Sequence, residues 1–152
     1  MPLVRTLALV LLSAAFLPLR AETPVYVEAA VGALMPGGSC RLSRSPLWAV
    51  RAGVSASDSF NLEAEFGEAR VNAFSARALW RPLGYERFDP FLSLGAGAFG
   101  NSSWRAGPEF GLGFLYYVGD HLALRADLRT CLTVDGAVEP ISSALAGVSW
   151  TF

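Results

Sequence analysis

Lysine does not occur in this sequence, and the residues that usually build catalytic and metal sites are scarce. The chain of 152 residues contains one histidine and two cysteines, and its formal net charge is −1. A chain so close to neutrality has no basic surface for nucleic acid. One imidazole and two thiols are also too few for an ordinary metal site. We therefore expect no metal, no cofactor and no nucleic-acid partner.

Long hydrophobic runs are missing as well, apart from residues 7–17. Hydrophobic residues make up 53% of the chain, yet no later stretch reaches the roughly 20 apolar residues of a transmembrane helix. Apolar residues spread in this way are typical of two structures. One is a soluble all-β core, and the other is a set of strands whose apolar face meets lipid.

Residues 1–21 predict a secretory signal peptide. Arg5 gives a positively charged start, the apolar run is too short to span a bilayer as a helix, and Ala21 is a small residue suited to cleavage. Because Leu19 is bulky for the position three residues before the cut, cleavage after Ala15 is an alternative, and an uncleaved anchor is another. We expect residues 22–152 to form one exported domain.

From Val25 onward the apolar residues recur with the period of two that is typical of β-strands. Eight such segments follow one another, separated by short polar or glycine-rich turns. The predicted strands cover residues 25–34, 48–56, 60–67, 74–81, 90–99, 109–117, 122–129 and 144–152. An even number of strands with short connections predicts an all-β fold, an eight-stranded antiparallel up-and-down transmembrane β-barrel.

In this register the apolar faces carry no charge, and the charged residues share the opposite faces. The residues on the charged faces are Glu28, Arg51, Glu63, Glu65, Arg77, Arg81, Glu109, Arg125, Asp127 and Arg129. Neighbouring carboxylates such as Glu63 and Glu65 suit general acid/base chemistry. The equal number of arginines instead favours mutual neutralisation in a narrow lumen, because buried charges persist only when they are paired. A soluble sandwich would show the same alternation with the charges outside.

Aromatic residues favour the membrane over the soluble sandwich. They gather at strand ends on the apolar faces, as in the two interfacial girdles of a membrane barrel. One predicted girdle has Phe60, Trp80, Tyr116 and Phe152, and the other has Trp48, Phe66 and Phe74.

The positions of glycine and proline also favour a membrane barrel over a soluble sandwich. Glycines are frequent on the charged faces, where a narrow interior must leave room for arginine and glutamate side chains. We expect every proline after the signal peptide to lie at or beyond a strand end, because proline cannot donate to the strand ladder.

Both cysteines are predicted in loops on the outer side of the barrel. With the start of the first strand in the periplasm, the turns at Ser57, 82–89 and 118–121 are periplasmic. The loops at 36–45, 68–72, 100–107 and 131–139 then face outward. Cys40 and Cys131 would lie beside the first and last strands, which are neighbours in a closed barrel. A disulfide is possible in an oxidising compartment, and two unpaired thiols are the alternative.

Strand by strand, the chain resembles the small outer-membrane β-barrel family of the OmpA/OmpX type, within the porin-like barrels. The segments that carry the resemblance are residues 88–98 (FDPFLSLGAGA), 117–129 (YVGDHLALRADLR) and 147–152 (GVSWTF). The resemblance implies that Val148, Trp150 and Phe152 are recognised by the outer-membrane assembly machinery. We also expect a monomer among outer-membrane lipids. Since the chain stops at Phe152, we expect no tether to the cell wall.

We expect a structural or surface role and no enzyme activity. An adhesin that binds through its outer loops is one alternative, although Trp104 is the main exposed aromatic residue there. A soluble lipocalin-like periplasmic barrel that holds a ligand in an apolar interior is another. A lipid A-modifying enzyme fits poorly. The only histidine, His121, is predicted in a periplasmic turn, and Ser142 and Ser143 have no base nearby.

Overall fold

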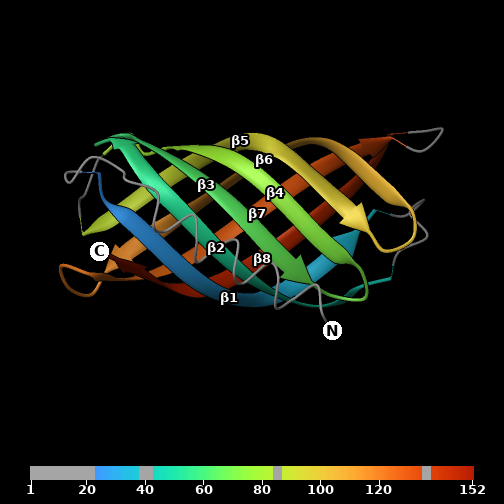
Figure 1. Cartoon of the computed structure of the whole chain (residues 1–152), viewed down its shortest axis with the longest axis horizontal. Coiled ribbons are helices and arrows are strands. Elements are labelled where there is room, and N and C mark those ends of the chain that lie inside the picture. The colour runs from blue at the N-terminus through green and yellow to red at the C-terminus, as the bar shows by residue number, and fades with distance from the viewer. Residues whose placement is uncertain (1–22, 38–42, 84–86, 135–137) are drawn as a thin grey trace.

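A computed structural model describes residues 23–37, 43–83, 87–134 and 138–152, and in these ranges the chain is made of eight β-strands (Figure 1). The strands are β1 (Val25–Pro36), β2 (Ser45–Ser57), β3 (Phe60–Glu68), β4 (Asn72–Trp80), β5 (Phe88–Gly100), β6 (Trp104–Tyr117), β7 (Leu122–Val134) and β8 (Val138–Thr151). The described ranges contain no helix long and apolar enough to cross a membrane. The predicted signal peptide, residues 1–21, lies outside them.

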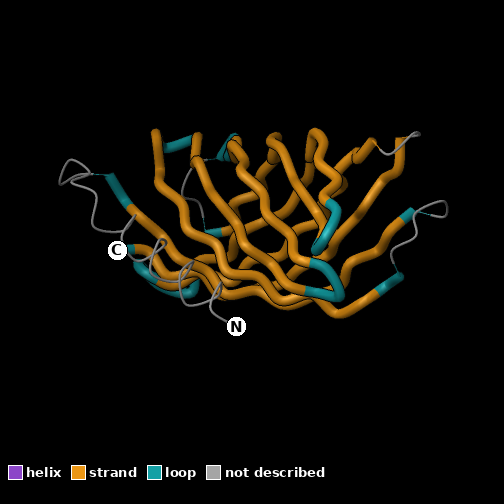
Figure 2. Tube along the Cα trace, turned by 45° about the vertical axis from the view of Figure 1, so that its right-hand side comes forward, coloured by secondary structure: helices purple, strands orange, loops and turns teal. Residues whose placement is uncertain are grey.

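The eight strands close into one antiparallel barrel. Each strand pairs with its neighbour in the chain, and β8 returns to pair with β1, where Val27 lies opposite Trp150. The residues opposite Tyr26 on successive strands, followed once round the barrel, lead back to β1 at Pro36, ten residues further on. Such a stagger requires strands tilted by about 35–45°. The connections lie only at the two ends (Figure 2), and the predicted fold class is confirmed.

Two names distinguish the ends of the barrel. The terminal end is where β1 begins and β8 ends, at the left of Figure 1, and there the Phe152 amide donates to the Val25 carbonyl oxygen at 2.9 Å. The far end carries the connections from β1 to β2, β3 to β4, β5 to β6 and β7 to β8.

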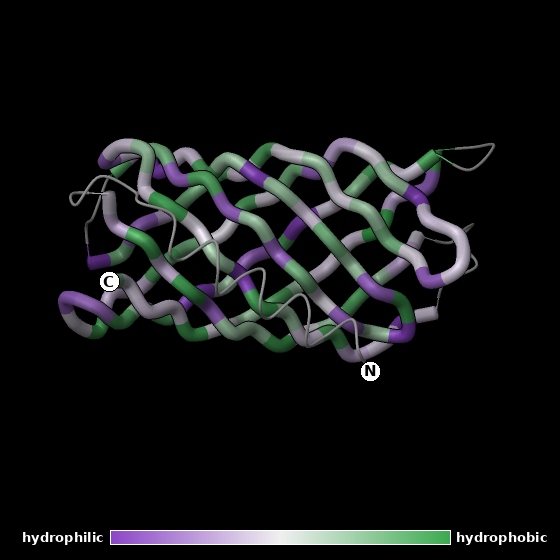
Figure 3. Tube along the Cα trace, viewed as in Figure 1, coloured by the Kyte–Doolittle hydropathy of each residue, from purple (hydrophilic) through white to green (hydrophobic). Residues whose placement is uncertain are grey.

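The outer wall is apolar and the interior is charged. Val31 and Leu94 on the outer face are each 68% exposed, whereas Arg51 on the inner face is 1% exposed. Hydrophobic and hydrophilic residues are interspersed along the strands (Figure 3). A soluble barrel has the opposite arrangement, so this wall is built to face hydrocarbon.

Aromatic side chains form a row on the outer wall toward the far end. The ring centroids of Trp48 and Phe66 lie 5.8 Å apart, those of Phe66 and Phe74 5.0 Å, and those of Phe74 and Trp104 5.4 Å. Toward the terminal end, Phe88 packs against Phe114 at 5.2 Å. Two aromatic levels separated by aliphatic wall are typical of interfacial girdles.

The prediction that every proline lies at or beyond a strand end is wrong. Pro46, Pro90, Pro108 and Pro140 all lie within strands, and Pro108 pairs with Ala96 of β5. The β6–β7 ladder stops next to Pro108, at the pair of Glu109 and Cys131. A proline is therefore accommodated where the ladder on one side has ended. The strands reach further than predicted, and the far-end connections are shorter.

Cys131 was also predicted in a loop, and that placement is wrong because β7 extends to Val134. Its side chain points into the interior and is 1% exposed. The thiol lies within hydrogen-bonding reach of the carbonyl oxygens of Gly97 at 3.6 Å and Gly107 at 3.4 Å. Cys40 lies outside the described residues, so a disulfide between the two stays a prediction.

Glycine makes room inside the narrow barrel, most clearly at Gly53. A Cβ atom there would lie 2.3 Å from Cζ of Tyr26. We therefore expect Gly53→Ala to lower the free energy of unfolding by about 1–3 kcal/mol, the usual cost of overpacking. Urea unfolding of the barrel in vesicles measures it. Gly119→Ala is the control, because a Cβ on this turn would meet nothing within 4 Å. Equal stability of the two variants would contradict the close fit.

Candidate functional site

The centre of the interior holds a ring of alternating charges. Arg51 contacts Glu28 at 2.5 Å and Glu65 at 2.6 Å. Glu65 continues to Arg77 at 3.2 Å, and Arg77 contacts Glu63 closely. Arg125 closes the ring, at 2.7 Å from Glu63 and 3.2 Å from Glu28. The ring has three acids and three arginines, contributed by β1, β2, β3, β4 and β7, so it ties together strands on both sides of the barrel.

Three further charged residues attach to this ring. Asp127 bridges Arg51 at 2.8 Å and Arg125 at 3.1 Å. Arg129 pairs with Glu65 toward the far end, and Glu109 lies beyond it at 3.6 Å. We call these nine residues, six in the ring and three attached to it, the lumen cluster. All nine are buried.

Neutral groups complete the hydrogen bonds of the lumen cluster. The Tyr26 hydroxyl donates to Glu63 Oε2 at 2.8 Å, and Arg129 Nε donates to Ser143 Oγ at 2.9 Å. The Arg125 guanidinium also lies over the Phe91 ring, 4.6 Å from its centroid. Charges removed from water are stable only when their hydrogen-bonding groups are largely satisfied, and most of those in the cluster are.

Apolar layers lie on either side of the lumen cluster along the barrel axis. Toward the far end, the far-end cap is a buried group that includes Leu34, Phe99 and Ile141, from three different strands. Toward the terminal end, Leu79, Phe91 and Leu115 form a smaller buried group. The charged centre is therefore enclosed between two apolar layers, and salt and water have little access to it.

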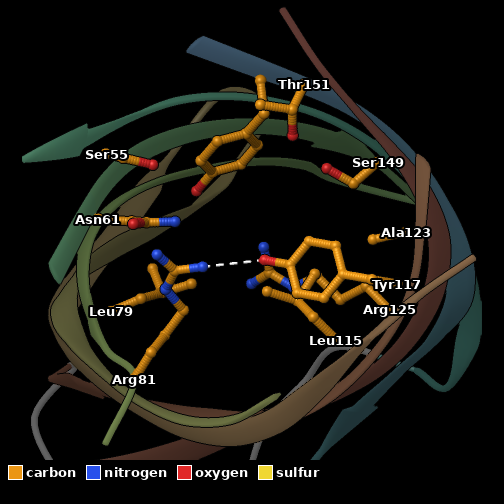
Figure 4. Close-up of a pocket in the computed structure, with 11 residues that line it drawn as sticks. Ser55, Asn61, Leu79, Arg81, Leu115, Tyr117, Ala123, Arg125, Ser149 and Thr151 are labelled. Atoms are coloured by element: carbon orange, nitrogen blue, oxygen red, sulfur yellow. Dashed lines mark hydrogen bonds between the residues drawn. The ribbon is translucent and has the colours of Figure 1, made fainter. Parts of the chain in front are cut away.

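A small cavity of about 20 Å³, lined by both polar and apolar side chains, opens beside the smaller apolar group (Figure 4). Arg81 and Tyr117 point toward one another across it, and Arg81 Nη1 donates to the Tyr117 hydroxyl at 2.9 Å. The Asn61 side chain lines the wall, where its buried Oδ1 has no hydrogen-bond partner within the protein. A volume of this size accommodates about one water molecule, which Asn61 Oδ1 could hold by accepting a hydrogen bond.

The structure brings together nine of the ten charged residues that the alternation assigned to the lumen. Arg81 lies apart from the others, next to the terminal end. It contacts Asp89 Oδ2 at 3.3 Å and donates to the Asp58 carbonyl oxygen at 3.0 Å. The expected balance of five acids and five arginines therefore does not hold within the lumen cluster itself.

Several interior residues were missed by the sequence reasoning. Tyr26 lies on the same face as Glu28, where the alternation places it, but it was not counted among the lumen residues. Asp89 was missed because the fifth strand was started at Pro90. Arg105 and Glu139, which pair at 2.5 Å near the far end, were assigned to loops because Pro108 and Pro140 were taken as strand ends.

The predicted assembly residues share one outer face at the end of β8. Val148, Trp150 and Phe152 are exposed, and Phe152 is 72% exposed at the rim of the terminal end. His121 stacks on Trp150, with ring centroids 5.9 Å apart, and its Nδ1 lies 3.0 Å from the Thr151 carbonyl oxygen. Nothing in this geometry tests recognition by the assembly machinery.

An apolar outer wall, two aromatic levels and a closed antiparallel barrel together define a small eight-stranded transmembrane β-barrel. Solved structures of that class are similar to this chain. The N-terminal β-barrel domain of OprF from Pseudomonas aeruginosa has a TM-score of 0.64 and 18% identity, and the match covers 84% of this chain and 97% of that domain. No protein-family model and no curated protein matches the sequence.

Two other similar structures show how little the fold says about function. Ail, the attachment invasion locus protein of Yersinia pestis, solved with the heparin analogue sucrose octasulfate, has a TM-score of 0.56 and 13% identity, over 86% of this chain and 97% of Ail. A de novo designed transmembrane β-barrel has a TM-score of 0.60 and 14% identity, over 85% of this chain and 95% of the design. At these identities the likeness establishes the fold alone.

Proposed function

We propose that this protein is a small integral barrel of a bacterial outer membrane with a structural or surface role, and that its lumen is a plug and not a pore. The enclosure of the lumen cluster between two apolar layers carries the proposal. The barrel is oriented with its terminal end facing the periplasm and its far end facing outward. The partners are outer-membrane lipids and, through Val148, Trp150 and Phe152, the barrel assembly machinery.

The buried ion pairs that fill the interior support a closed lumen. Arg51 and Arg125 reach across to acids on other strands, and both side chains are 1% exposed. A hydrated ion would have to displace these pairs, which costs several kcal/mol for each charge left without a partner. The far-end cap would also have to open. Both requirements oppose a continuous path of water.

The interior does not suit the lipocalin-like alternative. A barrel that holds an apolar ligand lines its interior with apolar side chains, whereas the middle of this interior is occupied by the lumen cluster. The interior cavity between Arg81 and Tyr117 is about 20 Å³, which is far smaller than the 300–1,000 Å³ typical of ligand pockets.

The residues considered for lipid A chemistry lie apart. His121 is in the turn before β7 at the terminal end, whereas Ser142 and Ser143 are in the far-end half of β8. Ser142 Oγ lies 2.9 Å from Thr130 Oγ1, and Ser143 Oγ accepts a hydrogen bond from Arg129. A nucleophilic serine needs a base within hydrogen-bonding distance, and neither serine contacts His121.

Adhesion through outer loops gains no specific support. Trp104, the aromatic residue considered for it, packs against Phe74 in the aromatic row. The connection between β5 and β6 has only three residues, 101–103. What Ail binds is a property of Ail, and at the far end of this barrel Arg105 is paired with Glu139.

Conductance tests the plug. The barrel, purified in detergent and inserted into a planar lipid bilayer, is expected to give no resolved single-channel steps. A barrel of the same strand number with a known open lumen, inserted under identical conditions, serves as the positive control. Regular steps of large conductance from this protein would contradict the proposal.

A further inference from the structure

The lumen cluster holds one more acid than arginine, because Arg81 pairs with Asp89 outside it. Its acids are Glu28, Glu63, Glu65, Glu109 and Asp127, and its arginines are Arg51, Arg77, Arg125 and Arg129. Arginine stays charged under all conditions in which a protein is folded. With every carboxyl ionised, the enclosed cluster would keep a charge of −1. A buried carboxyl in such a position takes up a proton instead.

Glu109 has the weakest ionic contacts of the five acids. Its Oε1 atom lies 3.3 Å from Arg77 and 3.6 Å from Arg129, and it has no hydrogen-bond partner. Glu28, the next candidate, uses one oxygen for Arg51 at 2.5 Å and the other for Arg125 at 3.2 Å. A carboxylate gains most where guanidinium groups approach it closely, so Glu109 gains least from being ionised.

The surroundings of Glu109 give it no further positive charge. Arg77 faces it from β4, Arg129 from β7 and Glu65 from β3, and Asp127 of β7 adds a second negative charge. From β5, Gly97 leaves the space for Glu109 Oε2, since a Cβ there would lie 2.7 Å from that atom and 3.3 Å from the Cys131 thiol.

A metal ion is not a good alternative source of the missing charge. Within the described ranges, no three histidine, cysteine, aspartate or glutamate side chains are arranged to hold one. A proton needs only one carboxyl group and no ligand cage.

We propose that Glu109 is a proton-binding site, holds the proton that neutralises the lumen cluster, and thereby makes the plug sensitive to alkaline pH. Glu109 lies on the far-end side of the ring, close to Cys131 of the far-end cap. Loss of its proton places an uncompensated negative charge directly against that cap and loosens it. The inference rests on the enclosed lumen proposed above, which conductance at neutral pH tests independently.

Infrared spectroscopy of the folded barrel in vesicles at neutral pH tests the assignment. The wild type is expected to show the carbonyl stretch of one protonated carboxylic acid, and Glu109→Gln is expected to lose that band. Glu65→Gln is the matched control. Glu65 contacts Arg51, Arg77 and Arg129. Its replacement also removes the excess acid and is expected to lose the band, but it lowers the midpoint of urea unfolding because three arginines lose an ionised partner. Glu109→Gln is expected to keep that midpoint.

A pH series separates Glu109 from the other groups that titrate in alkali. Wild type and Glu109→Gln share Tyr26 and Cys131, so only the difference between their unfolding midpoints reports on Glu109. As the pH rises, the unfolding midpoint of the wild type is expected to fall further than that of Glu109→Gln. The carbonyl band of the protonated acid is expected to disappear from the wild-type spectrum over the same series. Absence of the band from the wild type at neutral pH overturns the inference, even if no variant folds. An unfolding midpoint that falls in Glu109→Gln but is kept in Glu28→Gln overturns the assignment to Glu109.

Discussion

Replacement of Arg51 by methionine is expected to lower the free energy of unfolding by about 3–5 kcal/mol, the usual cost of removing one partner from a buried ion pair. Arg51 contacts Glu28 at 2.5 Å, Glu65 at 2.6 Å and Asp127 at 2.8 Å. Methionine fills much of the same volume, so the expected loss comes from three acids that lose their shared cation. Urea unfolding of the barrel refolded into vesicles measures it.

The control for this change is Arg44→Met. Arg44 lies just before β2 at the far end and is exposed, so its replacement is expected to change stability by less than about 0.5 kcal/mol. If Arg51→Met were no more destabilising than Arg44→Met, the lumen cluster would not hold the strands together, and the plug would lose its energetic basis.

The second large effect is expected on the outer wall, where Leu94→Arg should cost about 2–4 kcal/mol in a bilayer. Leu94 is the middle residue of β5 and is 68% exposed on the outer face. In lipid, an arginine there would place its charge in the middle of the hydrocarbon layer. In a soluble barrel the same substitution would exchange an exposed leucine for a solvated charge and cost little.

Val138→Arg is the matched control for depth. Val138 is the first residue of β8, at the rim of the far end, and is 63% exposed. Arginine at the membrane interface costs only about 0–1 kcal/mol. The difference between the two variants, measured as the free energy of folding into vesicles, therefore reports the position of the bilayer. Equal values for Leu94→Arg and Val138→Arg would place both sites in water.

The fold was predictable from the sequence because one pattern determines most of it. A one-residue slip of any strand moves its side chains to the opposite face, so the uncharged faces fixed the register. Val31 and Leu94 lie outside and Arg51 lies inside, as the alternation predicts. Strand ends were less predictable, because Pro108 and Pro140 are compatible with a strand whose neighbouring ladder has ended. Residues 131–134 were also predicted as loop, although β7 includes them.

The composition of the interior was predictable, but its connectivity was not. Alternation assigns Arg81 and Arg77 to the same face without giving their depth in the barrel. The tilt of the strands decides that depth, and it places Arg81 beside Asp89 and Arg77 among the ring of acids. The excess of one acid, on which the role of Glu109 depends, appears only after the pairs are known.

Fractionation of cell membranes tests most directly whether the apolar wall is embedded in a membrane. Membranes from cells that express the protein are washed with neutral buffer of high ionic strength, and the washed pellet is run on a gel with and without heating. The protein is expected to stay in the pellet and to migrate differently when unheated, because the closed barrel resists the detergent until it is boiled. Release into the wash without detergent, with the same mobility in heated and unheated samples, would contradict the claim.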